Sequence, residues 1–311
     1  MKMKNKLIIC CTLVLFALTA TALISGTVGA KSLYLVPNHN NQQFDAWNIN
    51  PDGTMTYQAT YGLSWATDPA GMAIDESSNT LFITTEFSSS STTFEIVDAN
   101  TMTIIGYIND GDDFAGIAVD DQNDIIYTAK RMNIDADDLY AYDWNPSTST
   151  ATLRAGYPID LPNLNQAMGI ALDEPRGILW VADSGAGIAR AYDTTAWTED
   201  LSKSFTPVHK PVAIAVDSVR NFVYTVSMNA GAWTPSGCGS LILSKYDVAT
   251  STETTGSLID QGVGIAVNEV TGYAYVTISP YGAGQPSVQA WDTSTNPFTP
   301  VSYTHLRAHE T

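Results

Sequence analysis

Pairs of polar residues recur along the sequence, each directly ahead of a short apolar segment. The pairs are Thr67-Asp68, Asp112-Asp113, Asn165-Gln166, His209-Lys210 and Asp260-Gln261. If the apolar segments are equivalent strands, these pairs converge at one end of the fold. Carboxylate and amide oxygens are the ligands that Ca²⁺ takes in proteins. The candidate metal ligands are Asp68, Asp113, Asn165 and Asp260. Beside such an ion, His209 would act as general base towards a polarised water or carbonyl; alternatively, all these residues are solvated entrance residues of an acidic protein.

Other side chains are suited to binding rather than to catalysis. Gln166 and Lys210 offer an amide and an ammonium group for hydrogen bonds. Trp233 and Tyr281 lie in long irregular segments, where an aromatic ring would stack on a sugar or a peptide. The alternative is that each ring packs against its own loop. We therefore expect a surface protein or a glycan as the partner.

A short apolar segment that ends in Asp or Asn defines the elements that position these residues. Its copies are GMAID (71–75), GIAVD (116–120), GIALD (169–173), AIAVD (213–217) and GIAVN (264–268), and their last residues lie 45, 53, 44 and 51 positions apart. An aromatic residue lies seven positions beyond each copy: Phe82, Tyr127, Trp180, Tyr224 and Tyr275. A polar turn separates this apolar segment from the segment that contains the aromatic residue. A third segment, which also ends in Asp or Asn, comes next, and a Thr- and Ser-rich segment follows it. Four short strands in a repeat of this length predict a β-propeller blade, with an irregular sandwich as the alternative.

Counting these segments predicts an all-β, six-bladed β-propeller with four-stranded blades over residues 31–300. The third segment occurs six times and the first only five times, so the first blade lacks its innermost strand. We expect the missing strand to follow the C-terminus of the sequence given, because a closed ring leaves no sheet edge exposed. Residues 301–311 (VSYTHLRAHET) have no place in the repeat, and we interpret them as a non-native tail that resembles a translated sequencing adapter.

The first 30 residues have the pattern of an export signal. Lys2, Lys4 and Lys6 precede an apolar run over residues 7–23, and Ala30 ends a plausible cleavage site. We expect a secreted or cell-surface protein with no transmembrane segment after cleavage; an uncleaved anchor is the alternative. The chain has 32 acidic against 14 basic residues and a net charge of −18. Such a surface repels nucleic acid, which we exclude as a partner.

The segment GIALDEPRGILWVADSGAGIARAYD (169–193) resembles an NHL-type repeat, and GIAVNEVTGYAYVT (264–277) is similar to the YVTN family of surface-protein propellers. The resemblance covers about residues 32–299 and implies a scaffold or ligand-binding propeller. The same superfamily includes Ca²⁺-dependent lactonases of the gluconolactonase and paraoxonase kind, but their early Gly-Glu-Gly/Ser-Pro type motif is absent here. We therefore expect a non-enzymatic binding module; a Ca²⁺-dependent hydrolase and a structural surface-layer component are the alternatives.

Overall fold

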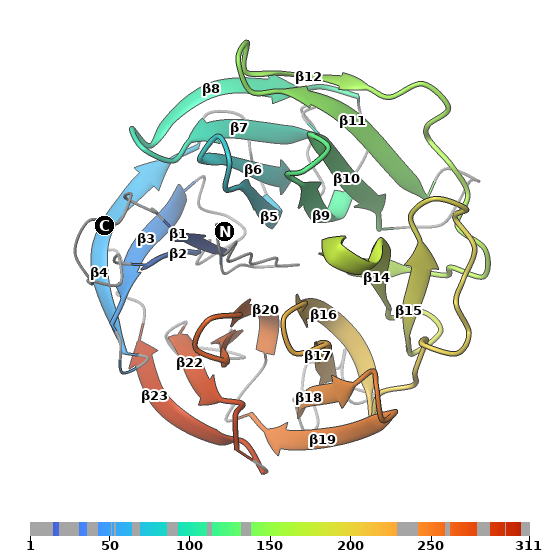
Figure 1. Cartoon of the computed structure of the whole chain (residues 1–311). Helices are drawn as coiled ribbons and strands as arrows, with labels where there is room; N and C mark the ends of the chain where they lie inside the picture. Colours follow the sequence, from blue (N-terminus) through green and yellow to red (C-terminus); the bar gives the residue numbers. More distant parts are fainter. Residues whose placement is uncertain are drawn as a thin grey trace, which may run out of the picture.

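The computed structural model describes residues 15–18, 31–35, 43–50, 52, 54–63, 69–85, 93–110, 114–131, 138–228, 242–258, 262–278, 287–295 and 297–305. Their strands form small antiparallel sheets arranged in a ring (Figure 1). In these residues the only helical element is a 3-10 turn, η1 (Glu174–Arg176). No helix in them is long and apolar enough to span a membrane. The prediction of an all-β propeller is confirmed.

We call the sheets blades and number them in chain order. Blade one comprises β1 (Leu15–Leu18), β2 (Lys31–Leu35), β3 (Gln43–Ile49) and β4 (Met55–Gly62), and blade two comprises β5 (Pro69–Asp75), β6 (Thr80–Thr85), β7 (Phe94–Asp98) and β8 (Thr103–Ile108). Blade three comprises β9 (Phe114–Asp120), β10 (Ile125–Lys130), β11 (Leu139–Asn145) and β12 (Thr150–Leu153), and blade four comprises β13 (Ala167–Asp173), β14 (Ile178–Asp183) and β15 (Ile188–Asp193). Blade five comprises β16 (Lys210–Asp217), β17 (Phe222–Met228), β18 (Ile242–Asp247) and β19 (Thr252–Ser257), and blade six comprises β20 (Gly262–Asn268), β21 (Tyr273–Ile278), β22 (Ser287–Asp292) and β23 (Thr299–His305).

Five complete four-stranded blades are present where six were predicted, because blade four has only three strands. Two tight turns interrupt the segment that should form its fourth strand. The Trp197 N–H donates to the Asp193 carbonyl at 2.9 Å, and the Ser204 N–H donates to the Asp200 carbonyl at 2.9 Å. Two isolated bridges to β15 replace a continuous strand: Ala189 with Phe205 and Tyr192 with Glu199.

The predicted repeat register is confirmed. Each aromatic residue of the second strand lies opposite the alanine of the preceding first strand. The pairs are Ala73 with Phe82, Ala118 with Tyr127, Ala171 with Trp180, Ala215 with Tyr224 and Ala266 with Tyr275. All five rings are buried, and Trp180 is 0 % exposed. The small alanine leaves room beside the large ring, so the two positions together fill the space between neighbouring blades.

The glycine of the repeated first-strand motif lies where neighbouring innermost strands come closest. A Cβ atom on Gly116 of β9 would lie 2.8 Å from the Ile170 backbone nitrogen and 3.1 Å from the Gly169 Cα in β13. A Cβ atom on Gly71 of β5 would lie 3.1 Å from the Ala115 carbonyl oxygen. All three distances are shorter than ordinary van der Waals contact. At Gly71 and Gly116 the motif has glycine because adjacent innermost strands touch there, whereas blade five has Ala213 at the corresponding position.

The aspartates that end the first strands hold the turns that follow. Asp75 accepts the Ser77 N–H at 2.8 Å, and Asn268 accepts the Val270 N–H at 3.0 Å in the same way. Short polar side chains favour such turns because their oxygen replaces a backbone acceptor. The Asp or Asn that ends the first strand therefore has a structural role in the turn.

Blade one and the C-terminal residues differ from the prediction. The innermost position of blade one, predicted to be vacant, is occupied by β1, which pairs with β2 in the register Leu15 to Tyr34 through Leu18 to Lys31. An extended segment there satisfies N–H and C=O groups that β2 would otherwise expose. Residues 301–305 were predicted to lie outside the repeat, but they are part of β23, which pairs with β22 as the fourth strand of blade six.

Candidate functional site

Four of the predicted site residues lie in the described part of the chain: Asn165, Gln166, His209 and Lys210. The other predicted site residues, Asp68, Asp113, Asp260, Trp233 and Tyr281, lie outside it. The proposed Ca²⁺ ligand set is therefore represented by Asn165 alone. Among the described residues, no group of three or more His, Cys, Asp or Glu side chains is placed to hold a metal ion.

Asn165 and Gln166 are held in place by a carboxylate from the neighbouring strand. The backbone N–H groups of Asn165 and Gln166 each donate to Asp183 at 3.1 Å. Asp183 ends β14 and also accepts the Ala186 N–H at 3.0 Å, while the Ser184 N–H donates to the Gln166 carbonyl at 2.9 Å. One buried carboxylate thus fixes the segment before β13 and the turn between β14 and β15.

A buried cation fixes Asp183 in turn. The Arg190 Nε donates to Asp183 at 2.7 Å, and its Nη1 donates to both Glu199 oxygens, at 2.9 and 3.0 Å. The side chains of Arg190, Asp183 and Glu199 are only 8 %, 0 % and 4 % exposed. Burial lowers the pKa of Arg190, but the hydrogen bonds to Asp183 and Glu199 and the attraction of their charges together outweigh burial and leave its pKa raised. The guanidinium is therefore a permanent positive charge under the turn.

Lys210 reaches the same turn from the next blade. Its Nζ lies 3.4 Å from the Gly185 carbonyl oxygen. A Cβ atom on Gly185 would lie 2.5 Å from the Asn165 Oδ1, so the amide of Asn165 packs directly against this glycine and would have to move for a larger residue. The structure thus brings Asn165, Gln166 and Lys210 around one rigid turn, with the half-buried His209 next to Lys210 in the chain. We call Asn165, Gln166, Lys210 and the turn 184–187 the blade-four platform.

The charge of Lys210 is unusual in this acidic chain. Five other described basic side chains form ion pairs with carboxylates: Arg154, Arg176, Arg190, Lys203 and Arg220. The Lys245 Nζ lies over the rings of Phe222 and Phe298, 5.2 and 5.7 Å from their centroids. Lys210 forms no ion pair with any described residue. The platform therefore offers amide groups and a cation that can hydrogen-bond a carboxylate or a hydroxyl group.

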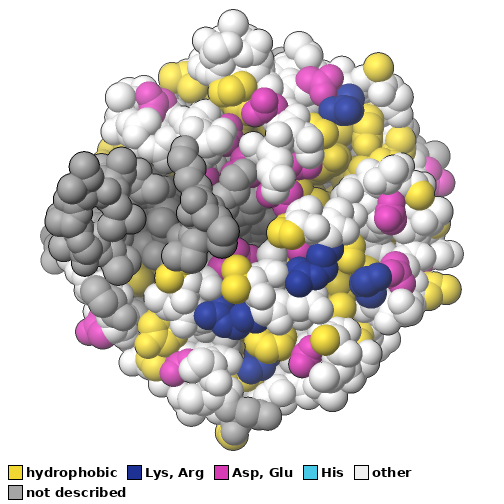
Figure 2. Space-filling model, in the orientation of Figure 1, with side chains coloured by type: hydrophobic (Ala, Val, Ile, Leu, Met, Phe, Trp, Pro, Cys, Tyr) yellow, Lys and Arg dark blue, Asp and Glu magenta, His cyan; other side chains and the backbone are white. Residues whose placement is uncertain are grey.

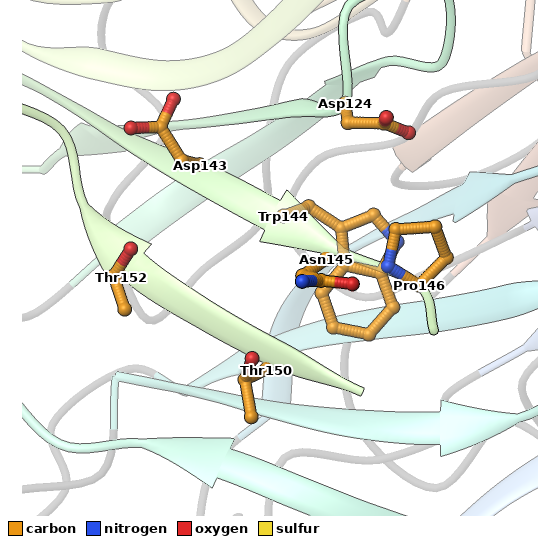
Figure 3. Close-up of a pocket in the computed structure, with 7 residues that line it drawn as sticks. All are labelled: Asp124, Asp143, Trp144, Asn145, Pro146, Thr150 and Thr152. Atoms are coloured by element: carbon orange, nitrogen blue, oxygen red, sulfur yellow. The ribbon is translucent and has the colours of Figure 1, made fainter. Parts of the chain in front are cut away.

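A shallow pocket lies on blade three, away from the predicted site. It has a volume of about 530 Å³ and is lined by Asp124, Asp143, Trp144, Asn145, Pro146, Thr150 and Thr152. Figure 3 shows Asn145 and Pro146 beside the Trp144 indole, with Asp143 and Thr152 on the other side. The indole is 4 % exposed and donates through Nε1 to Asp75 at 3.0 Å, so it supports the fold rather than a ligand. Six of its lining residues lie within residues 143–152, in β11, β12 and the turn between them, and the fold adds Asp124 from the turn before β10. This segment was not among the predicted site residues.

No family model and no curated protein matches this chain. Among solved structures it is similar to a chain of a nidogen/laminin complex, with a TM-score of 0.51 and 15 % identity, covering 81 % of this chain and 93 % of that one. It is also similar to a hydrazine synthase chain from Kuenenia stuttgartiensis, with a TM-score of 0.51 and 14 % identity. That match covers 75 % of this chain and 64 % of the other. At these identities the likeness concerns the propeller fold alone.

Proposed function

We propose that this protein is an exported β-propeller that binds a surface protein or glycan through the blade-four platform. The observation that carries this proposal is that Lys210, which pairs with no described carboxylate, lies at the same turn as Asn165 and Gln166, a turn fixed by buried charges. A platform held in this way loses little conformational entropy when a ligand binds. The cation and the two amides fit a ligand that carries a carboxylate among hydroxyl or amide groups.

The proposed export depends on the sequence. Cleavage after Ala30 would remove β1, so in the exported form the innermost position of blade one would need another strand. Lys2, Lys4 and Lys6 ahead of an apolar run have the pattern of a secretory leader. We also assign the repeats to the NHL and YVTN type, because the segments 169–193 and 264–277 have that pattern. In the nidogen/laminin complex a propeller chain belongs to a protein assembly, and we extend a role in interaction to this chain by analogy.

Binding to cell envelopes tests the proposal. Fluorescently labelled protein is added to isolated envelopes of the producing cells, before and after protease treatment and before and after periodate oxidation of glycans. We expect saturable binding that one of the two treatments removes. The double variant Gln166→Ala/Lys210→Ala should lose this binding, because it removes an amide and the Lys210 ammonium group.

The matched control is Lys203→Ala, which removes a half-exposed lysine that already pairs with Asp200. This variant should bind like the unaltered protein. Envelope binding that the double variant retains in full would exclude the blade-four platform as the binding site. An absence of any saturable binding would refute the proposed function itself.

A further inference from the structure

The turns that follow the first strands of blades four, five and six form a second surface. The second residue after the strand-ending Asp or Asn is polar in blades two and three, where it is Ser77 and Gln122. In the next three blades it is Pro175, Val219 and Val270. Val219 is 67 % exposed and Val270 is 41 % exposed, and Pro175 is also exposed. We call Pro175, Arg176, Val219, Arg220 and Val270 the turn arc.

Two arginine side chains join these turns across the seams between blades. The Arg176 Nη1 of blade four donates to the Ser218 carbonyl of blade five at 2.9 Å. The Arg220 Nη1 of blade five donates to the Glu269 carbonyl of blade six at 2.7 Å, and its Nη2 lies 3.4 Å from the Val270 carbonyl oxygen. The three exposed apolar residues therefore lie on neighbouring turns that are tied together, and the surface they form is continuous.

The arc exposes its positive charges and buries the matching negative ones. Arg176 pairs with Asp173 at 3.0 Å, and Arg220 pairs with Asp217 at 2.7 Å. The arginine side chains are 34 % and 32 % exposed, whereas the two carboxylates are 3 % and 0 % exposed. Figure 2 shows this face, on which basic and hydrophobic side chains gather over the half of the ring that contains β14 to β20. A partner that approaches the arc meets guanidinium groups and apolar side chains.

The turn arc and the blade-four platform lie at opposite ends of the same strands. In blade four, Gln166 directly precedes β13 and Pro175 follows its last residue, Asp173. A strand rises by about 3.3 Å per residue, so the two surfaces are roughly 20 Å apart. A ligand on the platform therefore leaves the turn arc accessible, and the two surfaces can act independently.

We propose that the turn arc binds a short peptide segment of a protein partner in which aliphatic residues alternate with Asp or Glu. The aliphatic side chains pack on Pro175, Val219 and Val270, and the carboxylates accept hydrogen bonds from the partly exposed guanidinium groups of Arg176 and Arg220. The net charge of −18 repels an extended acidic surface. Electrostatic attraction of an acidic partner is confined to the arc, which favours a short peptide segment over a large acidic domain.

Peptide binding to the full chain tests this inference. The probes are short synthetic peptides in which Leu alternates with Glu, compared with peptides in which Lys replaces Glu, and the readout is fluorescence anisotropy. We expect the Glu peptides to bind and the Lys peptides not to bind. Val219→Asp should weaken binding at least about tenfold, because it places a carboxylate where an aliphatic side chain and acidic residues must dock.

The control is Leu201→Asp, the same kind of change at a residue that is 75 % exposed outside the arc; it should leave peptide affinity unchanged. Equal binding of Glu and Lys peptides, binding of neither, or unaltered affinity of Val219→Asp would overturn the inference. Binding of the chain to phosphatidylglycerol vesicles but not to the Glu peptides would also overturn it, by assigning the arc to a membrane. The variant Gln166→Ala/Lys210→Ala should bind the Glu peptides normally.

Discussion

A methyl group added at Gly116 tests whether close contact between neighbouring innermost strands is the reason that this position is glycine. The Cβ of Gly116→Ala would lie 2.8 Å from the Ile170 backbone nitrogen and 3.2 Å from the Gly169 carbonyl carbon. Both neighbours are backbone atoms, so no side-chain rotation relieves the contact. The two strands must separate, and crowding of this kind in a packed core costs about 1–3 kcal/mol.

An opposing effect acts on the unfolded chain. Replacing Gly by Ala restricts the unfolded ensemble and stabilises a protein by about 0.4–1 kcal/mol where the native backbone accepts alanine. Gly62→Ala in β4 isolates this effect, because nothing lies within 4 Å of a Cβ at that position. We expect Gly116→Ala to lower the free energy of unfolding by about 1–2 kcal/mol net, and Gly62→Ala to leave it unchanged or raise it slightly.

The measurement is equilibrium unfolding in urea, followed by tryptophan fluorescence, for both variants and the unaltered protein. Folded content is checked by circular dichroism before unfolding. If Gly116→Ala proves as stable as Gly62→Ala, the blades are not in contact at this position, and the explanation of the glycine motif is wrong.

Further changes test the buried charges, the repeat core and the turns. Arg190→Met should lower the free energy of unfolding by about 3–5 kcal/mol, since it leaves two carboxylates buried without their cation, whereas Lys203→Met breaks a half-exposed pair and should cost less than about 1 kcal/mol in the same urea titration. Trp180→Ala should cost about 3–5 kcal/mol; a smaller loss would show that the ring does not fill the space between blades. Turn N–H donors lower the pKa of Asp98 and Asp193, so the stability that these carboxylates contribute is present above the usual pKa of 3.8 and is lost as the pH falls below it. Acid titration of Asp98→Asn/Asp193→Asn should therefore show a shallower loss of stability than the unaltered chain, and an identical acid transition would contradict this account.

The sequence predicted the repeat register because strand geometry leaves a periodic trace in it. The alanine at the third position of the motif and the aromatic residue seven positions after its end are fixed by one short turn and by alternation across a sheet. Ala171 and Trp180 illustrate this, because they are directly opposite each other in β13 and β14. The Thr- and Ser-rich fourth strands of blades two and three were also predicted correctly, as β8 and β12.

Features that depend on contacts between distant segments were not predicted. The segment after Asp193 was expected to be a strand, but hydrogen bonds within its own turns compete with pairing along β15. The residue types of the turn arc were visible in the sequence, but only the fold shows that Val219 and Val270 are exposed on neighbouring turns joined by Arg220. The buried contact of Arg190 with Asp183 and Glu199 likewise joins residues whose pairing has no local signature.

The incomplete outer edge of blade four has a consequence for the motions of the native protein. Segments held by few backbone bonds open locally without global unfolding, and their amide hydrogens then exchange with solvent. The amides of residues 198–206, attached to β15 by two isolated bridges, should exchange with deuterium well before those of β13 and β14. Each opening also separates Glu199 from the Arg190 guanidinium, 2.9 Å away when closed. The exchange rate of this segment therefore reports, in the native state, how strongly the buried cation keeps the blade closed.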